Sequence, residues 1–146
     1  MDALATLKSD HERIRETFER MHQIEALDAK RKIFEQLKDD LDFHCHLEET
    51  ILYPALNHRA ELRELLEEFY DEHQEITDVL EEIDESDDEE EAMFEDDMDE
   101  LEECVEFHLQ REETELFPQV LQVLGGPRLQ QVSNALEDAR QKLAVA

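Results

Sequence analysis

Two segments of the chain pair a histidine with a glutamate four residues later, in matching surroundings. The first is FHCHLEETILYP at residues 43–54, and the second is FHLQREETELFP at residues 107–118. Residues four apart share one face of an α-helix, so each segment would present an imidazole nitrogen beside a carboxylate oxygen. These donors suit iron, manganese or zinc better than copper(I). One such pair alone is weak evidence, because histidine and glutamate at this spacing also form ordinary helix contacts.

Polar residues also interrupt the apolar stripes of the helices that must position these pairs. Apolar residues recur every three or four positions through four long segments of the chain, which is the pattern of amphipathic helices. Six polar residues fall in gaps of these stripes, so we expect them to point into the core. They are His11, His44, Glu48, His73, His108 and Glu112.

The four histidines are also expected at one depth. In an antiparallel hairpin, two residues at the same level lie equally far from the turn. The midpoint between His11 and His44 falls at residues 27–28, and each later pair of histidines is likewise centred on a break in the helical pattern. Glu48 and Glu112 follow one helical turn after a histidine and therefore join the same level.

The helical segments themselves predict an all-α fold. Their stripes run over about residues 4–21, 27–55, 62–83 and 94–123, and short connections between long helices favour an up-down antiparallel four-helix bundle, about residues 2–124. Gly125, Gly126 and Pro127 read as a helix stop followed by a start. A shorter C-terminal helix is expected at about 127–144, within one domain spanning 1–146.

Composition excludes several classes of partner and location. The formal net charge of −29 argues against nucleic acid and anionic lipid, since phosphate binding requires clustered Lys and Arg. No stretch is apolar enough to span a membrane, and no secretion signal is evident, so we expect a cytoplasmic protein. Cys45 and Cys104 are expected as reduced thiols. The acidic stretch from Asp84 to Ala92 is predicted to be a solvated loop rather than a calcium site.

Two buried carboxylates need a positive charge beside them. Moving an ionised carboxylate into a protein interior costs several kcal/mol, against a total domain stability of about 5 to 15 kcal/mol. Six ligands exceed what one structural zinc takes, and two carboxylates able to bridge suit a pair of ions. The sequence therefore predicts a two-metal site, with a metal-free polar core as the alternative.

The same residues carry a resemblance to a known family. DHERI at 10–14, HCHLEETILYP at 44–54, EHQEI at 72–76 and HLQREETELFP at 108–118 form an H, HxxxE, H, HxxxE series. In this respect the chain resembles the hemerythrin-like, HHE cation-binding family over about residues 2–124. The resemblance implies a non-haem centre of two iron ions bridged by Glu48 and Glu112. It also implies His11 and His44 on one iron, with His73 and His108 on the other.

Several nearby residues have alternative interpretations. Oxygen-carrying members of that family place a further histidine where this chain has Thr77, which leaves one position at the second iron open. Tyr70 could supply a phenolate there or be a packed aromatic residue. Glu49 and Glu113 could hydrogen-bond ligand imidazoles or be solvated surface acids. Pro54 and Pro118 are expected to bend or end their helices.

The resulting functional hypothesis is a di-iron protein that binds or reacts with dioxygen, peroxide or nitric oxide. The alternative is an oxygen or nitric oxide sensor, or an iron-handling or iron-sulfur repair protein without turnover. A metal-free acidic interaction bundle is a third class. The sequence leaves open whether the protein is an enzyme.

Overall fold

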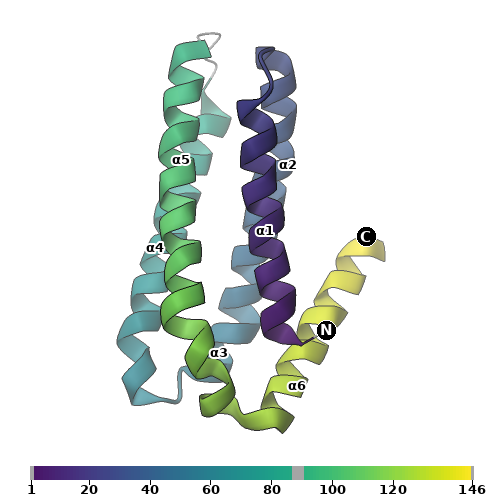
Figure 1. Ribbon diagram of the computed structural model, residues 1–146, viewed down its shortest axis with the longest axis vertical. Helices are drawn as coiled ribbons and strands as arrows, with labels where there is room; N and C mark the ends of the chain where they lie inside the picture. The colour runs from purple at the N-terminus through teal and green to yellow at the C-terminus, as the bar shows by residue number, and fades with distance from the viewer. Residues whose placement is uncertain (1, 87–90, 146) are drawn as a thin grey trace.

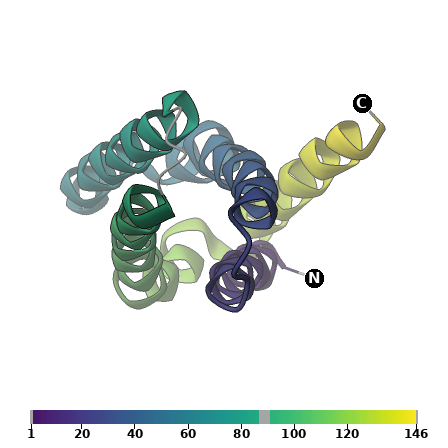
Figure 2. The same ribbon diagram turned by 90° about the horizontal axis from the view of Figure 1, so that it is seen from above.

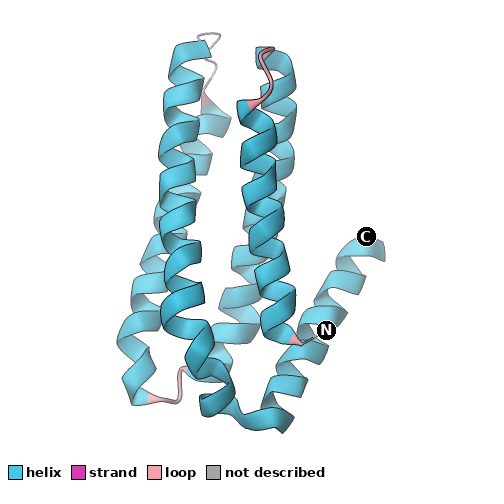
Figure 3. Cartoon of the chain, in the orientation of Figure 1, coloured by secondary structure: helices cyan, strands magenta, loops and turns pink. Residues whose placement is uncertain are grey.

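Helices make up nearly all of the described part of the protein and are arranged as long rods in the computed structural model (Figure 1). The structure describes residues 2–86 and 91–145, and within these ranges it contains no strand (Figure 3). The elements are α1 (Ala3–His22), α2 (Leu27–Leu47), η1 (Glu48–Leu52), α3 (Tyr53–Leu56), α4 (Ala60–Glu85), α5 (Glu91–Arg111), η2 (Glu112–Leu116) and α6 (Phe117–Val145). The prediction of an all-α, up-down four-helix bundle is confirmed.

The rods follow the chain in order. The first is α1, the second is the continuous run of α2, η1 and α3, the third is α4, and the fourth is α5 with η2 and the start of α6. Consecutive rods run antiparallel and surround a common interior (Figure 2). The acidic break is shorter than predicted, because α4 continues through Glu85 and α5 begins at Glu91. The rest of the predicted loop, residues 87–90, lies outside the described residues.

Two apolar clusters fill the interior, one on each side of the level of the histidines. Leu7 and Leu47 belong to the cluster nearer the N-terminus of α1, while Ile14 and Leu41 belong to the cluster beyond it. The polar level therefore lies between two dry layers. None of the helices in residues 2–86 and 91–145 combines the length and apolar character needed to cross a bilayer.

Two π-helical turns interrupt the second and fourth rods, and each begins at one of the predicted glutamate ligands. In η1 the backbone N–H of Tyr53 donates to the carbonyl of Glu48, five residues earlier. Pro54 follows directly; it has no N–H, and its ring would crowd the carbonyl of Thr50 in a regular α-helix. The wider turn relieves this crowding. The second π turn, η2, repeats the arrangement with Glu112, Phe117, Pro118 and Thr114.

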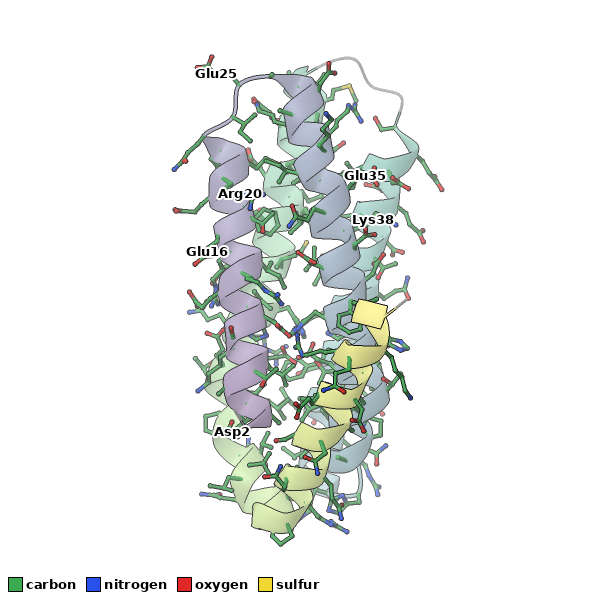
Figure 4. The ribbon with its side chains drawn as sticks, turned by 90° about the vertical axis from the view of Figure 1, so that its right-hand side faces the viewer. Asp2, Glu16, Arg20, Glu25, Glu35 and Lys38 are labelled. Atoms are coloured by element: carbon green, nitrogen blue, oxygen red, sulfur yellow. The ribbon has the colours of Figure 1, made fainter. Side chains whose placement is uncertain are left out.

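Pro54 and Pro118 were expected to bend or end their helices; the helices continue through both prolines, and each proline directly follows a locally widened turn. The true interruption of the fourth rod is at Gly125, whose φ of 73° lies in the left-handed region that favours glycine. The last part of α6 then turns back along the bundle (Figure 4), where α6 contacts α1, η1 and α3. The predicted additional C-terminal helix is thereby confirmed.

The C-terminal helix is held by both apolar and polar contacts. Leu129, Val132 and Leu136 are buried in the same cluster as Ala3 and Leu7 of α1. The backbone N–H of Ala3 donates to Ser133 Oγ at 2.7 Å, which ties the first turn of α1 to this helix. The C-terminal helix therefore packs against α1, the helix that carries His11.

Candidate metal centre

All six residues singled out from the sequence are buried and lie close together in the middle of the bundle. Every rod contributes at least one of them. They are His11 from α1, His44 from α2, Glu48 from η1, His73 from α4, His108 from α5 and Glu112 from η2.

These residues form two groups of four that share both glutamates. One group contains His11 and His44 with Glu48 and Glu112, and the other contains His73 and His108 with the same two glutamates. Within each group the candidate ligand atoms all lie within 4.8 Å of one another. Two overlapping sets of donors with common carboxylates can hold two cations side by side.

The imidazoles face one another in pairs through their Nε2 atoms. The Nε2 atoms of His11 and His44 are 3.2 Å apart, and those of His73 and His108 are 2.9 Å apart. Both glutamates approach both pairs. Glu48 Oε1 lies 3.4 Å from His44 Nε2 and 3.0 Å from His73 Nε2. Glu112 Oε1 lies 3.3 Å from His11 Nε2 and 3.5 Å from His108 Nε2.

On its outer side, each of the four imidazoles faces a carboxylate of a neighbouring rod. His11 Nδ1 is 2.6 Å from Glu113 Oε2, His73 Nδ1 is 2.9 Å from Glu49 Oε2, and His108 Nδ1 is 2.7 Å from Glu72 Oε1. The fourth pair is looser, with His44 Nδ1 at 3.5 Å from Asp10 Oδ2 and without a hydrogen bond. We refer to Asp10, Glu49, Glu72 and Glu113 as the outer carboxylates.

The outer carboxylates set the state of the rings. A carboxylate accepts a hydrogen bond, so at three histidines the proton belongs on Nδ1, and the Nε2 lone pair points inward. The Nε2 atoms of His73 and His108 then have no N–H between them, and a proton or a metal cation would relieve their contact. Two carboxylate atoms at this level, Glu48 Oε2 and Glu112 Oε1, are also buried without a hydrogen-bond partner. These observations fit a pair of bound cations.

Burial and neighbouring charges shift the pKa values of the central carboxylates and of His44. Burial acts to raise the pKa of Glu48, but the charges and hydrogen bonds of its neighbours, led by His44, hold it well below the usual range. The pKa of Glu112 is raised, first by burial and then by the negative charge of Glu48. The pKa of His44 lies well above its ordinary value although burial opposes this, because Glu48 and Asp10 favour the charged ring. Metal binding would therefore have to displace the proton that these carboxylates favour on the His44 ring.

Tyr53 is a member of the site that the sequence did not reveal. Its hydroxyl donates to Glu112 Oε2 at 2.5 Å and lies 3.3 Å from His73 Nε2 and 3.4 Å from Glu48 Oε1. Burial, followed by the charges of Glu48 and Glu112, holds the pKa of this phenol well above its usual value. The group is consequently a neutral hydrogen-bond donor beside the His73–His108 pair.

Tyr70 does not take the place that was considered for it. Its side chain is 38% exposed, and its hydroxyl lies 3.5 Å from the backbone oxygen of Glu49. Its ring packs edge-on against Tyr53, with ring centroids 5.3 Å apart. The interpretation of Tyr70 as a packed aromatic residue is the one that the geometry supports.

Sequence reasoning missed half of the outer carboxylates. Glu49 and Glu113 were weighed as imidazole partners and do hydrogen-bond His73 and His11. Asp10 and Glu72 were not considered. The available signal was that each directly precedes a histidine, in DH and EH, but each faces the histidine of the next rod rather than its own neighbour.

A cavity with several apolar side chains in its lining lies away from this level. It has a volume of about 210 Å³, lies among α1, α2 and α5, and is lined by apolar residues that include Phe18, Met21, Phe94 and Met98. None of the six central residues lines it. The chemistry is therefore assigned from the donors and their burial rather than from the size of a cavity.

Comparisons with known proteins agree with the donor set. A family model described as the hemerythrin HHE cation binding domain matches residues 2–141. The crystal structure of a hemerythrin HHE cation binding domain-containing protein from Mycobacterium kansasii is similar, with a TM-score of 0.79 and 22% identity. That similarity covers 97% of this chain and 89% of the other. A comparison with curated protein sequences finds no match.

Proposed function

The chain belongs to the hemerythrin HHE cation-binding domain family, and from that premise we propose that it is a non-haem di-iron protein. In this proposal it binds or reacts with a small oxidant, namely dioxygen, peroxide or nitric oxide. The observation that carries the proposal is the pair of four-residue groups sharing Glu48 and Glu112. The free thiols of Cys45 and Cys104 are compatible with a cytoplasmic location.

Each central residue has a role in the proposal. His11 and His44 would hold one iron ion, and His73 and His108 the other. Glu48 and Glu112 would bridge the two ions, which is supported by the approach of each carboxylate to both histidine pairs. Iron, when bound, would supply redox chemistry toward the small ligand. Manganese and zinc suit the same nitrogen and oxygen donors but are less favoured here.

The protein's own residues would orient and protect that chemistry. The outer carboxylates keep the histidine Nε2 atoms facing inward, because their oxygens accept hydrogen bonds from the Nδ1–H groups of His11, His73 and His108. The two apolar clusters exclude water above and below the site. Tyr53 holds a proton on its hydroxyl next to Glu112 and His73. Tyr53 thereby places a hydroxyl donor beside the His73–His108 pair, within reach of a ligand bound there.

Metal analysis and chelation provide the primary test. The purified protein should contain about two iron ions per chain and should melt at a lower temperature after they are removed, because ions that bind only the folded state stabilise it. Glu112→Gln should lose both ions together, since the proposal makes this carboxylate a bridge. Glu103→Gln, an exposed substitution on the same rod, is the matched control and should retain both. Unchanged melting after complete removal of metal would refute the proposal.

Reactions of the loaded protein distinguish its possible activities. The optical spectrum should change on addition of dioxygen, peroxide or nitric oxide. Consumption of peroxide over many turnovers would indicate an enzyme, whereas reversible binding without consumption would indicate a sensor or carrier. Release of iron to an acceptor after about one turnover would indicate iron handling.

A further inference from the structure

Asp10 differs from Glu72 and Glu113 in the arginine that holds it. Arg15 binds Glu113 at 2.9 Å, and Arg111 binds Glu72; both arginines belong to the four rods. Asp10 is held instead by Arg140, which lies on the C-terminal helix, 130 residues away in the sequence. The C-terminal helix thus reaches a carboxylate that faces one of the central histidines.

The contact is made through the oxygen that faces His44. Arg140 donates from Nη2 to Asp10 Oδ2, and the same Oδ2 lies 3.5 Å from His44 Nδ1. The other oxygen, Oδ1, accepts from Arg13 Nη2 at 2.7 Å. Arg13 is a mostly exposed residue three positions along the same helix, and exposed pairs of this kind contribute little. Arg140 is therefore the main restraint on the oxygen that matters for His44.

Packing alone does not fix Asp10. A cavity of about 20 Å³, large enough for about one water molecule, is lined by Asp10 and His44 together with Arg13, Ile14, Asp40 and Phe43. The Asp10 carboxylate borders this space, and His44 Nδ1 has no hydrogen-bond partner, with Asp10 Oδ2 at 3.5 Å. Its orientation consequently depends on the groups that bind it, of which Arg140 approaches from outside the four rods.

We propose that Arg140 is a positioning residue for the metal centre: the C-terminal helix holds Asp10 in place, and Asp10 in turn keeps the ring of His44 oriented with Nε2 as the ligand. The inference rests on the proposed two-metal function. Arg140 would do for the His11–His44 pair what Arg111 does for the other pair through Glu72. The C-terminal helix would then be part of the machinery that builds the site.

The test uses zinc(II), a diamagnetic ion suited to the same donors, with the full chain. Affinities for the two ions are measured by competition with a chromophoric chelator, and the histidine Nδ1–H signals by NMR spectroscopy. Arg140→Gln should weaken one of the two ions by about tenfold, the low end of the effect seen on removing partners of metal ligands. The Nδ1–H signal of His44 should shift or broaden, while those of the other three ligand histidines stay unchanged.

Controls separate positioning from general support of the fold. Arg128→Gln alters an arginine near the start of the same helix, whose Nη1 lies 3.4 Å from His58 Nε2, and it should have no effect on zinc affinity. In an Asp10→Asn background, Arg140→Gln should cause no further loss of affinity, because its route to the metal has been removed. Arg140→Lys keeps the charge without the planar fork and should be intermediate; it carries the test if Arg140→Gln folds poorly.

Several outcomes would overturn the inference. Wild-type affinity for both ions in Arg140→Gln would do so, as would a full effect of Arg140→Gln in the Asp10→Asn background. Equal weakening of both ions with shifts at all four histidines would assign the helix a general packing role instead. If the wild-type chain itself fails to bind two ions, the proposed function fails first, and that result is distinguishable from a failure of the inference alone.

Discussion

Two aromatic residues at equivalent positions make the two halves of the site chemically different. Tyr53 and Phe117 each lie five residues after a central glutamate and directly before a proline. Tyr53 lies against His73, with ring centroids 5.5 Å apart, and Phe117 stacks on His11 at 5.6 Å. Of these two residues Tyr53 carries a hydroxyl and Phe117 does not, so at this pair of positions the His73–His108 half alone gains a proton donor.

This difference leads to a prediction for Tyr53→Phe. The substitution removes the donor to Glu112 Oε2 and leaves a buried carboxylate oxygen with one fewer partner. The metal-free protein should lose about 1–3 kcal/mol of unfolding free energy, measured by urea denaturation. Tyr70→Phe is the matched control, because that hydroxyl is exposed and makes only a 3.5 Å contact, and it should be neutral. Equal stability of the two variants would contradict the role given to Tyr53.

Residue types and spacing were sufficient to locate the central six residues, because each replaces an apolar residue in a regular stripe. Tyr53 could not be located in this way. A phenol ring in a stripe reads as ordinary core, and Tyr53 is indeed among the largest fully buried side chains. Its hydroxyl meets Glu112 of another rod, and such a contact depends on how the rods are rotated against one another.

At the scale of the elements, the π turns align each central glutamate with an aromatic residue five positions later. Pro118→Ala restores a backbone N–H and removes the crowding that favours η2. The metal-free variant should be as stable as the wild type or more so, while its metal affinity should fall because Glu112 and Phe117 shift in register. Calorimetry and chelator competition measure the two effects. Pro127→Ala, after the Gly125 interruption, should leave metal binding unchanged.

A pH-dependent contact joins the first and fourth rods away from the site. His22 Nε2 lies 2.7 Å from Glu102 Oε1, and this hydrogen bond is the main cause of a raised pKa for His22. A raised pKa means that the contribution is complete below the ordinary value near 6.5 and disappears as pH rises through the folded value. His22→Gln should therefore cost stability at pH 5.5 and nothing at pH 9, in urea unfolding.

The size of that effect should be small, because the pair is largely exposed; less than about 1 kcal/mol is expected. Glu102→Gln should remove the same pH-dependent increment, and combining the two substitutions should cost no more than either alone. A loss that is equal at both pH values would show that the histidine contributes by packing rather than by charge.

The order and depth of the helices followed from the positions of the breaks, since antiparallel rods with matched midpoints must bring His11, His44, His73 and His108 to one level. The two π-helical turns could not be predicted from the sequence pattern. The segments EETIL and EETEL are each compatible with a regular α-helix. The widening depends on the proline that follows each segment, together with the packing of the aromatic residue between them. The sharp turn at Gly125 was foreseen, because only glycine adopts that backbone conformation readily.

At the scale of the whole molecule, the net charge of −29 opposes compaction. Like charges spread over a folded surface repel one another, and dissolved salt screens this repulsion. The urea midpoint of the metal-free protein should therefore rise when sodium chloride is increased from about 10 mM to about 200 mM. A midpoint that falls would mean that the surface ion pairs, such as Arg15 with Glu106, outweigh the repulsion.

The outer carboxylates connect the rods in a closed circuit. Asp10 of the first rod faces His44 of the second, Glu49 of the second faces His73 of the third, Glu72 of the third faces His108 of the fourth, and Glu113 of the fourth faces His11 of the first. A twist of any single rod about its own axis would displace two imidazoles, the one it bears and the one it steadies. Because each rod holds a histidine of the next and the fourth holds one of the first, a rotation of one rod would disturb its neighbours in turn. The four rods must therefore reach their correct rotations together.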